Sequence, residues 1–366
     1  MSFEKGSFAV TIFRLEKSLP ENALDIFAAR KAKKLDDLKS EEDIGWVSGR
    51  HLLERRIDEG TAVCGGHYYL NLRMAQRKIP AALLNAECRM AELNFMQENN
   101  LDFVPAKMKK EIRENIESMR LPSMPPQISG IPFVIDKRDN ILYLGTASAK
   151  SIEAFCEYFF ETFQIEPVQV TLEDILMREF NEPLEALPEI CFSESARNND
   201  FMPAWDFLTW LWYYSETHNE GSLEVKDFGP FNIYIDGPLT FAFIDDNGGG
   251  AVETALKKGA PQKSAEAKIA LEIGKKLKKA KIFLASGNTV WNTAFDPAKY
   301  AFTGMTLPDG EEMDLHSKFE ERINYLNTFR VVMEEYFKLF AKTFLGDDSD
   351  NEIKKLQKWV ENKESA

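Results

Sequence analysis

The sequence predicts an α+β fold made of hairpins and helices. In several short runs apolar residues alternate with polar ones, which is typical of strands, and in longer runs they recur every three to four positions, which is typical of helices. Two strand-like runs, 132–136 and 141–144, flank the polar turn 137–140, as expected for an antiparallel hairpin. Because strands and helices do not alternate steadily, a doubly wound parallel sheet is disfavoured.

The composition is that of a globular protein large enough for two or three domains. The chain has 366 residues, 44% of them hydrophobic, and a net charge of −14. No apolar stretch approaches the ~20 residues that a membrane span requires, and residues 1–15 are expected to form a strand rather than a secretory signal. The four cysteines show no CxxC spacing and are expected to be reduced thiols. We therefore expect a cytoplasmic protein without membrane contact.

Proline and capping residues mark the expected helices. Ser18 to Glu21 resembles a capping box at the start of the first helix, and Pro80 and Pro105 open the two helices of an arm. The first arm helix carries an apolar stripe of Leu83, Leu84, Met90 and Leu93. The expected helices cover residues 20–38, 80 onward, 105–120, 148–163, 205–214, 263–280, 314–344 and 351–361. The expected strands lie near 8–15, 45–47, 61–64, 67–79, 132–136, 141–144, 167–172, 223, 231–235, 239–244, 282–285 and 289–295.

These elements suggest three parts along the chain. Residues 1–130 form an N-terminal α+β region with a helical arm over 80–120, and residues 131–310 form a second α+β region. Residues 311–366 are expected to form a helical C-terminal extension. No repeat of fixed period occurs, so a solenoid is not expected.

The densest positive charge lies in residues 257–281, with nine lysines and two glutamates. On a helix, four of these lysines form a basic ridge opposite an apolar sector that would pack on a core. The ridge consists of Lys268, Lys275, Lys276 and Lys279. Such a ridge in an acidic chain predicts contact with a polyanion, although a merely solvated helix face explains the same charge pattern.

Other basic residues extend this prediction. Phosphate contact requires positive side chains within reach and carries no sequence code, so scattered clusters can contribute. The further candidates are Lys263, Arg73, Arg77, Lys78, Lys107, Lys109, Lys110 and Arg113. We expect binding through charge and shape, with strong salt dependence and no cofactor.

A series of short motifs resembles the RdgC family of bacterial recombination-associated proteins. In chain order these are Gly45-Trp46-Val47, Lys78-Ile79-Pro80, Leu121-Pro122, Phe133-Val134-Ile135-Asp136 and Ala147-Ser148-Ala149-Lys150. The similarity is best over roughly residues 40–165, and the stretch 207–212 resembles longer family members. The chain departs from the family at Leu121-Pro122-Ser123-Met124-Pro125, where familiar members read LPRAF.

The resemblance implies a multi-domain, horseshoe-shaped subunit that pairs into a ring-shaped homodimer. In that family the ring encloses double-stranded DNA without sequence preference and opposes a RecA-type recombinase. The implied location is the cytoplasm, in association with the nucleoid. An acidic protein with a basic hole would reconcile the net charge with the lysine ridge.

Two other functions remain open. A metal-dependent exonuclease could use Asp245 or Asp246 with Glu266 and Lys268, although the acidic run is also a good turn. A protein-interaction module without DNA affinity is the third class. The aromatic helix 205–214 could stack on single-stranded DNA, but large aromatic residues more often form a core or an interface, which we favour. The histidines and Gly248-Gly249-Gly250 show no ligand or nucleotide-binding spacing.

Overall fold

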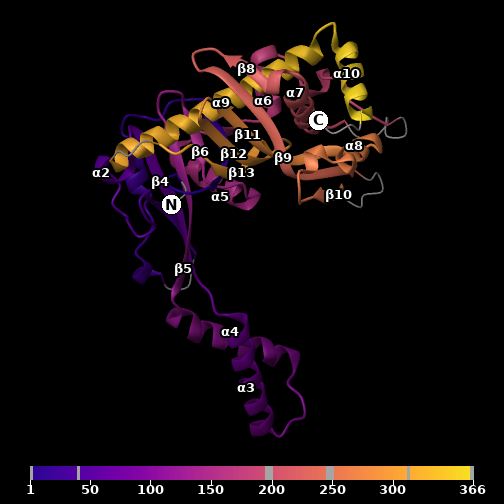
Figure 1. Ribbon diagram of the computed structural model, residues 1–366. Helices are drawn as coiled ribbons and strands as arrows, with labels where there is room; N and C mark the ends of the chain where they lie inside the picture. Colours follow the sequence, from indigo (N-terminus) through magenta and orange to yellow (C-terminus); the bar gives the residue numbers. More distant parts are fainter. Residues whose placement is uncertain (1–2, 39–41, 194–200, 245–250, 311–313, 363–366) are drawn as a thin grey trace. The chain divides into compact units, whose positions relative to one another are not determined.

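The computed structural model describes residues 3–38, 42–193, 201–244, 251–310 and 314–362 (Figure 1). Helices are combined with antiparallel strand pairs, so the α+β prediction is confirmed. No described helix is long and apolar enough to cross a membrane.

Contacts within the chain define two compact units. Unit 1 comprises the described residues of Met1–Ser18, Cys64–Tyr68 and Val134–Ala366, and unit 2 comprises those of Leu19–Val63 and Tyr69–Phe133. Strands β4 (His67–Arg77) and β5 (Pro126–Asp136) each contribute residues to both units. The three-part division along the sequence stays a prediction.

Unit 2 is built on β2 (Asp43–Ser48), which pairs antiparallel with β4. The rings of Phe27, Trp46 and Phe133 contact one another in its core. Gly45 allows β2 to approach the preceding chain, because a Cβ there would lie 2.5 Å from the Ala32 backbone. The helices of unit 2 are α1 (Ala23–Ala29), η1 (Leu35–Asp37), α2 (Glu59–Ala62), α3 (Ala81–Asn99), α4 (Ala106–Arg120) and η2 (Leu121–Ser123).

Two expectations for unit 2 are wrong. The first helix ends at Ala29 rather than near Leu38, because the chain beyond Arg30 pairs with β2: Trp46 N–H donates to the Arg30 carbonyl and Ala32 N–H to the Trp46 carbonyl. The strand expected near 61–64 is reduced to β3 (Val63–Cys64), since an Asp58–Thr61 capping box starts α2 just before it. In both places specific hydrogen bonds, with β2 in the first and within the capping box in the second, override the apolar pattern.

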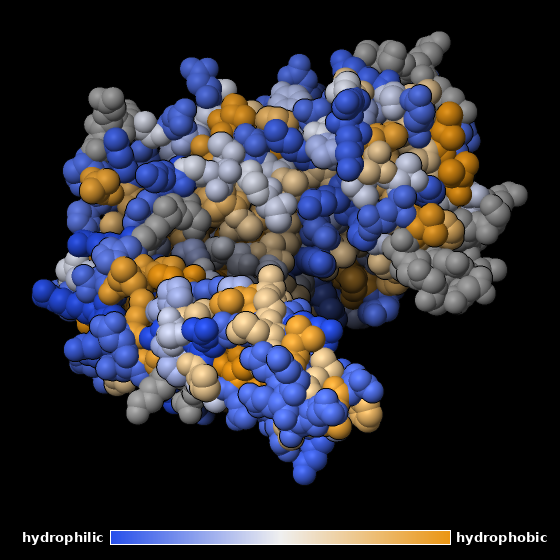
Figure 2. Space-filling model, turned by 90° about the horizontal axis from the view of Figure 1, so that it is seen from below, coloured by the Kyte–Doolittle hydropathy of each residue, from blue (hydrophilic) through white to orange (hydrophobic). Residues whose placement is uncertain are grey.

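The two helices predicted for the arm are confirmed, because α3 and α4 begin directly after Pro80 and Pro105. The apolar stripe is only partly buried, however. Leu84 is buried, while Met90 is 61% exposed, and Leu83 and Leu93 are also exposed. Figure 2 shows hydrophobic residues among hydrophilic ones on one face of the molecule.

Unit 1 contains an antiparallel sheet in the order β10-β9-β11-β12-β13-β1-β6. Its strands are β1 (Phe8–Leu15), β6 (Ile141–Leu144), β7 (Pro167–Gln169), β8 (Ser222–Val225), β9 (Gly229–Ile244), β10 (Ala251–Leu256), β11 (Lys276–Ser286), β12 (Thr289–Asp296) and β13 (Ala301–Thr306). The two strands expected over 231–244 are therefore one long strand, β9. Strand β7 pairs with β1, and β8 pairs with β9.

The helices of unit 1 are α5 (Ala149–Phe163), α6 (Leu172–Phe180), η3 (Leu184–Ala186), α7 (Pro203–Thr217), η5 (Asn219–Gly221), η6 (Pro261–Lys263), α8 (Ala265–Glu272), α9 (Leu315–Leu345) and α10 (Ser349–Glu361). Of these, α7 and α9 cover one face of the sheet, which we call its inner face. Figure 1 shows α7 and α9 along one side of the strands, where Phe329 of α9 meets Phe302 and Phe340 meets Phe207. The expected C-terminal helices are confirmed as α9 and α10.

The predicted lysine helix over 263–280 is wrong. Helix α8 ends at Glu272, Gly274 has a φ of +92°, and the chain then enters β11 at Lys276. Along β11 the buried residues Ala280, Ile282 and Leu284 recur at every second position, as a strand requires. Pairing with β9 and β12 on both sides therefore overrides a pattern that also fitted a helix.

Candidate nucleic-acid interface

Lys276, a first choice for phosphate contact, is instead part of the core of unit 1. It is 4% exposed, and its Nζ lies 3.0 Å from the carboxylate of Asp206 on α7, which is buried as well. Burial raises the pKa of the Asp206 carboxyl, and the Lys276 ammonium opposes that rise. The pair joins α7 to β11, so Lys276 is not available to a ligand in this structure.

Lys268 is occupied by the C-terminal helix. Its Nζ donates to the carbonyl oxygens of Trp359 at 3.1 Å and Asn362 at 2.8 Å. The ammonium also lies 4.8 Å from the centre of the Trp359 ring. A cation bonded to the last carbonyls of a helix stabilises that helix end, so Lys268 caps α10.

Two further lysines contact β10, which lies on the other side of β9. Lys275 donates to the Thr254 hydroxyl, and Lys278 forms an ion pair with Glu253. The predicted ridge therefore does not exist as one surface, because Lys276 contacts α7, Lys268 contacts the end of α10 and Lys275 contacts β10, while Lys279 lies beside β9.

A different set of lysines gathers around the bend of β9 at Gly237. Register places Lys279 beside Thr240 and Lys281 beside Asp236. Pro261 packs against Gly237, which brings the segment between β10 and α8 to the same bend. We call this set the basic corner; it consists of Lys257, Lys258, Lys263, Lys279 and Lys281, of which the first three are exposed and the last two partly exposed.

The arginines of β4 serve the structure of unit 2. Arg73 is 1% exposed, bonds the Lys33 carbonyl and lies 3.2 Å from the Asp43 carboxylate. Arg77 donates to the carbonyls of Leu38 and Met124. Of this group Lys78 is exposed and could meet a phosphate.

The basic residues of α4 are exposed but accompanied by glutamates. Lys107, Lys110 and Arg113 each pair with the glutamate four residues later, at 3.9, 3.7 and 3.0 Å. Lys109 lies 3.9 Å from Glu92 of α3. Exposed pairs of this kind are weak, typically ~0.5 kcal/mol, so a phosphate can compete for these cations.

Comparison with known families finds a match in the N-terminal half of the chain. Residues 9–176 match the family model RdgC, described as "Putative exonuclease, RdgC". Over these residues the chain is RdgC-like. No match was found among curated proteins.

The carboxylates of this RdgC-like chain bear on the exonuclease description. Glu266 is exposed in the first turn of α8, and Lys268 is bound to α10, while Asp245 and Asp246 lie outside the described residues. Among the residues that the structure describes, no group of three or more histidine, cysteine, aspartate or glutamate side chains could hold a metal ion.

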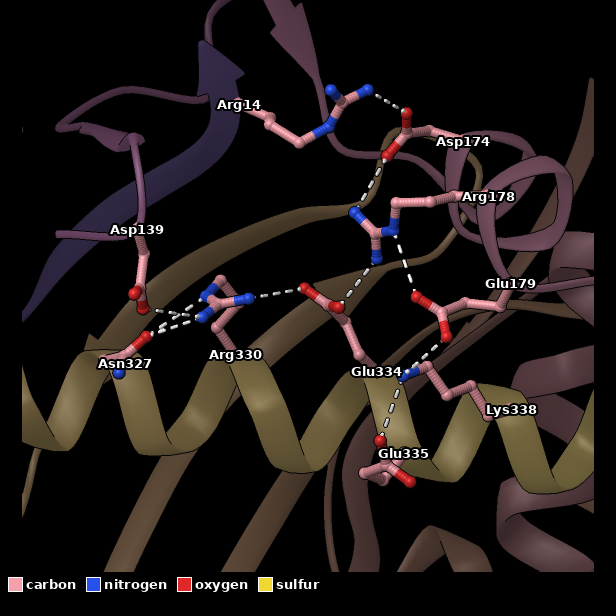
Figure 3. Close-up of polar contacts among 10 residues, drawn as sticks. All are labelled: Arg14, Asp139, Asp174, Arg178, Glu179, Asn327, Arg330, Glu334, Glu335 and Lys338. Carbon is pink, nitrogen blue, oxygen red and sulfur yellow. Dashed lines mark hydrogen bonds and ion pairs between the residues drawn. The ribbon is translucent and has the colours of Figure 1, made fainter. Parts of the chain in front are cut away.

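A cluster of charged side chains connects β1, α6 and α9 (Figure 3). Asp174 accepts a hydrogen bond from Arg14 at 3.0 Å and lies 3.6 Å from Arg178. Glu334 accepts from Arg178 at 2.9 Å and from Arg330 at 3.0 Å. Each of these carboxylates is therefore neutralised by two guanidinium groups. We interpret the network as a connection between helices rather than as a cation site.

The aromatic helix is core, as favoured from the sequence. Trp205, Trp210 and Trp212 of α7 are buried, and Trp212 and Trp359 each donate to a different oxygen of Glu216. Two rings that lie side by side near the surface are found elsewhere, on β9 and β11. Sequence reasoning missed them, although the alternation along 231–236 singles out Tyr234 as the outward residue among buried neighbours.

Proposed function

We propose that this RdgC-like chain binds double-stranded DNA without sequence preference and takes part in recombination in the nucleoid. The match of residues 9–176 to the RdgC family carries the proposal. It is supported by two exposed basic surfaces, the basic corner of unit 1 and the lysines of α4 in unit 2.

Charge argues for local contact rather than long-range attraction. The net charge of −14 repels a nucleic acid at a distance, and salt screens that repulsion beyond about 8–10 Å. Close to the surface, lysines without a carboxylate neighbour dominate. The affinity should therefore rise with each phosphate that a lysine neutralises.

We also propose that the functional form is a homodimer, joined through the α3–α4 arm. Two helices alone cannot bury their apolar side chains, and Phe103 and Met119 are 68% and 74% exposed. A second copy of the arm would cover them. A ring of two subunits around a duplex would hinder a RecA-type recombinase, which is the further partner that we propose.

Salt titration tests the DNA proposal. The logarithm of duplex affinity should fall against the logarithm of salt concentration with a slope near −0.9 per phosphate contact. Changing Lys257, Lys258, Lys263 and Lys279 together to glutamine should flatten the slope by about 0.9 for each phosphate that is no longer neutralised. A matched control changes the exposed lysines Lys354 and Lys358 of α10. An unchanged slope in the fourfold variant would rule out the basic corner as the duplex site.

The oligomer is tested by sedimentation. Phe103→Ser combined with Met119→Ser should convert a dimer to a monomer, whereas Leu315→Ser, at another exposed apolar residue, should not. A monomeric wild-type protein at micromolar concentration would contradict the dimer.

The exonuclease remains the second candidate because the matched family is described by that activity. Magnesium-dependent loss of labelled DNA ends, abolished by Asp246→Asn, would establish it over the binding protein. Absence of any duplex shift at low salt would instead favour a protein-interaction module.

A further inference from the structure

The outer face of β9, β11 and β12 is open, in contrast to the inner face under α7 and α9. On the inner face Ile233, Leu284 and Trp291 are buried, and Trp291 Nε1 donates to the Tyr325 carbonyl of α9. On the outer face Tyr234 is 38% and Val290 43% exposed. Such a face is a flat surface with side chains standing roughly perpendicular to it.

Two aromatic rings stand side by side on this face. Tyr234 of β9 lies directly opposite Phe283 of β11 in the strand register, and Asn292 of β12 lies opposite Phe283 on its other side. Side chains in such register have Cβ atoms about 4.5–5.5 Å apart. The Tyr234 hydroxyl donates to a carboxylate oxygen of Glu220 at 3.3 Å, which fixes one edge of its ring.

The basic corner continues from these rings along the same strands. Lys281 is two residues from Phe283 on the same side of β11, and its Nζ lies 4.6 Å from the Phe283 ring centre. Lys279 follows two residues further, beside Thr240. Asp236 is the acidic residue opposite Lys281, so the five lysines of the corner outnumber the carboxylate beside them.

We propose that this outer face binds single-stranded DNA. Tyr234 and Phe283 would stack on successive bases, Asn292 would offer its amide to a base edge, and Lys279 and Lys281 would contact the backbone phosphates. Lys281 would leave the Phe283 ring for a phosphate when a base takes its place. Exposed rings on a sheet flanked by cations are suited to unpaired bases, because every base presents a stacking face.

A duplex cannot use the ring pair in this way, because its bases are already stacked on one another inside the helix. It can use the lysines, which contact phosphates of either form. The inference therefore deepens the proposed function. Only its lysine contacts rest on that function, since they are the contacts that both forms of DNA share. The ring pair distinguishes the two ligands.

The test compares a fluorescent oligo(dT) with a hairpin duplex by anisotropy. Tyr234→Ala and Phe283→Ala should each weaken oligo(dT) binding about tenfold and change duplex binding by less than about twofold. Phe228→Ala, at an exposed ring in the turn between β8 and β9, is the matched control and should leave both affinities unchanged. Equal losses for oligo(dT) and duplex, or no loss beyond that of the control, would overturn the inference.

A variant that keeps an aromatic ring at position 234 distinguishes loss of stacking from misfolding. In Tyr234→Trp the new indole should bind oligo(dT) with undiminished affinity, and its fluorescence should be quenched on binding. A protein that binds duplex but not oligo(dT) would overturn this inference and leave the proposed function standing. Binding of neither would overturn both, and ring-dependent binding of oligo(dT) alone would support the inference against the duplex proposal.

Discussion

The two basic segments of the chain, residues 257–281 and helix α4, use similar side chains in opposite ways. In the first, Lys276 is buried against Asp206 and Lys268 caps α10. In the second, Lys107, Lys110 and Arg113 are exposed and pair weakly with glutamates one turn away. Lysine density in a sequence therefore does not reveal which cations a ligand can reach.

The difference follows from the elements that carry the two segments. A strand in the middle of a sheet sends alternate side chains into the core, so a lysine in β11 must be buried with a partner or point outward. Helix α4 packs against α3 in the arm, which leaves most of its surface to solvent. The predictions below test whether the buried charges stabilise the fold and the exposed ones serve binding.

The largest effect is expected at the buried pair. Asp206→Asn leaves the Lys276 ammonium buried without its counter-charge, which should lower the free energy of unfolding by about 3–5 kcal/mol. Urea denaturation of the variant and the wild type measures this change in the free energy of unfolding. The combined change Asp206→Leu with Lys276→Met should lose less than either single change. A loss under about 1 kcal/mol for Asp206→Asn would show that Lys276 is not committed to the core.

Two adjacent glutamates of α9 give a sharper contrast. Glu334 is buried between Arg178 and Arg330, whereas Glu335 pairs with Lys338 at the surface (Figure 3). Glu334→Gln should cost about 1.5–3 kcal/mol, and Glu335→Gln less than about 1 kcal/mol. Thermal unfolding of the two variants side by side checks this, and equal shifts would contradict the structural role of the network.

Within residues 257–281, substitution of Lys268 should affect stability and substitution of Lys263 should affect DNA binding. Lys268→Gln should lower stability by about 1–2 kcal/mol, since it removes two hydrogen bonds and the cation beside the Trp359 ring, and should leave the salt slope of duplex binding unchanged. Lys263→Gln should keep stability within about 0.5 kcal/mol and reduce the slope by about 0.9. The reverse result would contradict the assignment of Lys268 to the fold and of Lys263 to DNA contact.

The smallest effect is a pH dependence from a buried histidine. His67 is buried, neither ring nitrogen has a hydrogen-bond partner among the described residues, and burial lowers its pKa against the pull of Asp136. The unfolded chain takes up a proton at about pH 6.5, so stability should fall as the pH drops through and below that value.

Denaturation curves between about pH 7.5 and 5 measure this contribution. His67→Gln should flatten the decline, whereas the exposed His51→Gln should not. If His67→Gln left the pH dependence of stability unaltered, the buried histidine would not be its cause.

Local signals predicted several elements correctly. Pro80 and Pro105 directly precede the two arm helices, where a missing N–H costs no helical hydrogen bond. The large aromatic residues of 205–214 favoured a core or an interface, and α7 is buried in the core. The RdgC motifs at 45–47 and 147–150 pointed to the family that residues 9–176 match.

Elsewhere the same kind of signal failed. Ile269, Leu277 and Ala280 fit a helical period, yet Gly274 turns the chain and β11 takes its hydrogen bonds from β9 and β12. Partners so distant in sequence cannot be inferred from a local pattern. The stacking candidates were misplaced for the same reason, since Tyr234 and Phe283 become neighbours only through strand register.

By itself, the sequence determined the α+β class, the arm, the C-terminal helices and the family resemblance, because each depends on short-range periodicity, capping or motif order. Tertiary structure alone decided which charges are exposed. Burial of Lys276 and Arg73, capping by Lys268 and the pairing of Tyr234 with Phe283 all require contacts between distant segments. A side chain's charge is fixed by its chemistry, whereas its availability to DNA is fixed by the neighbours that the fold provides.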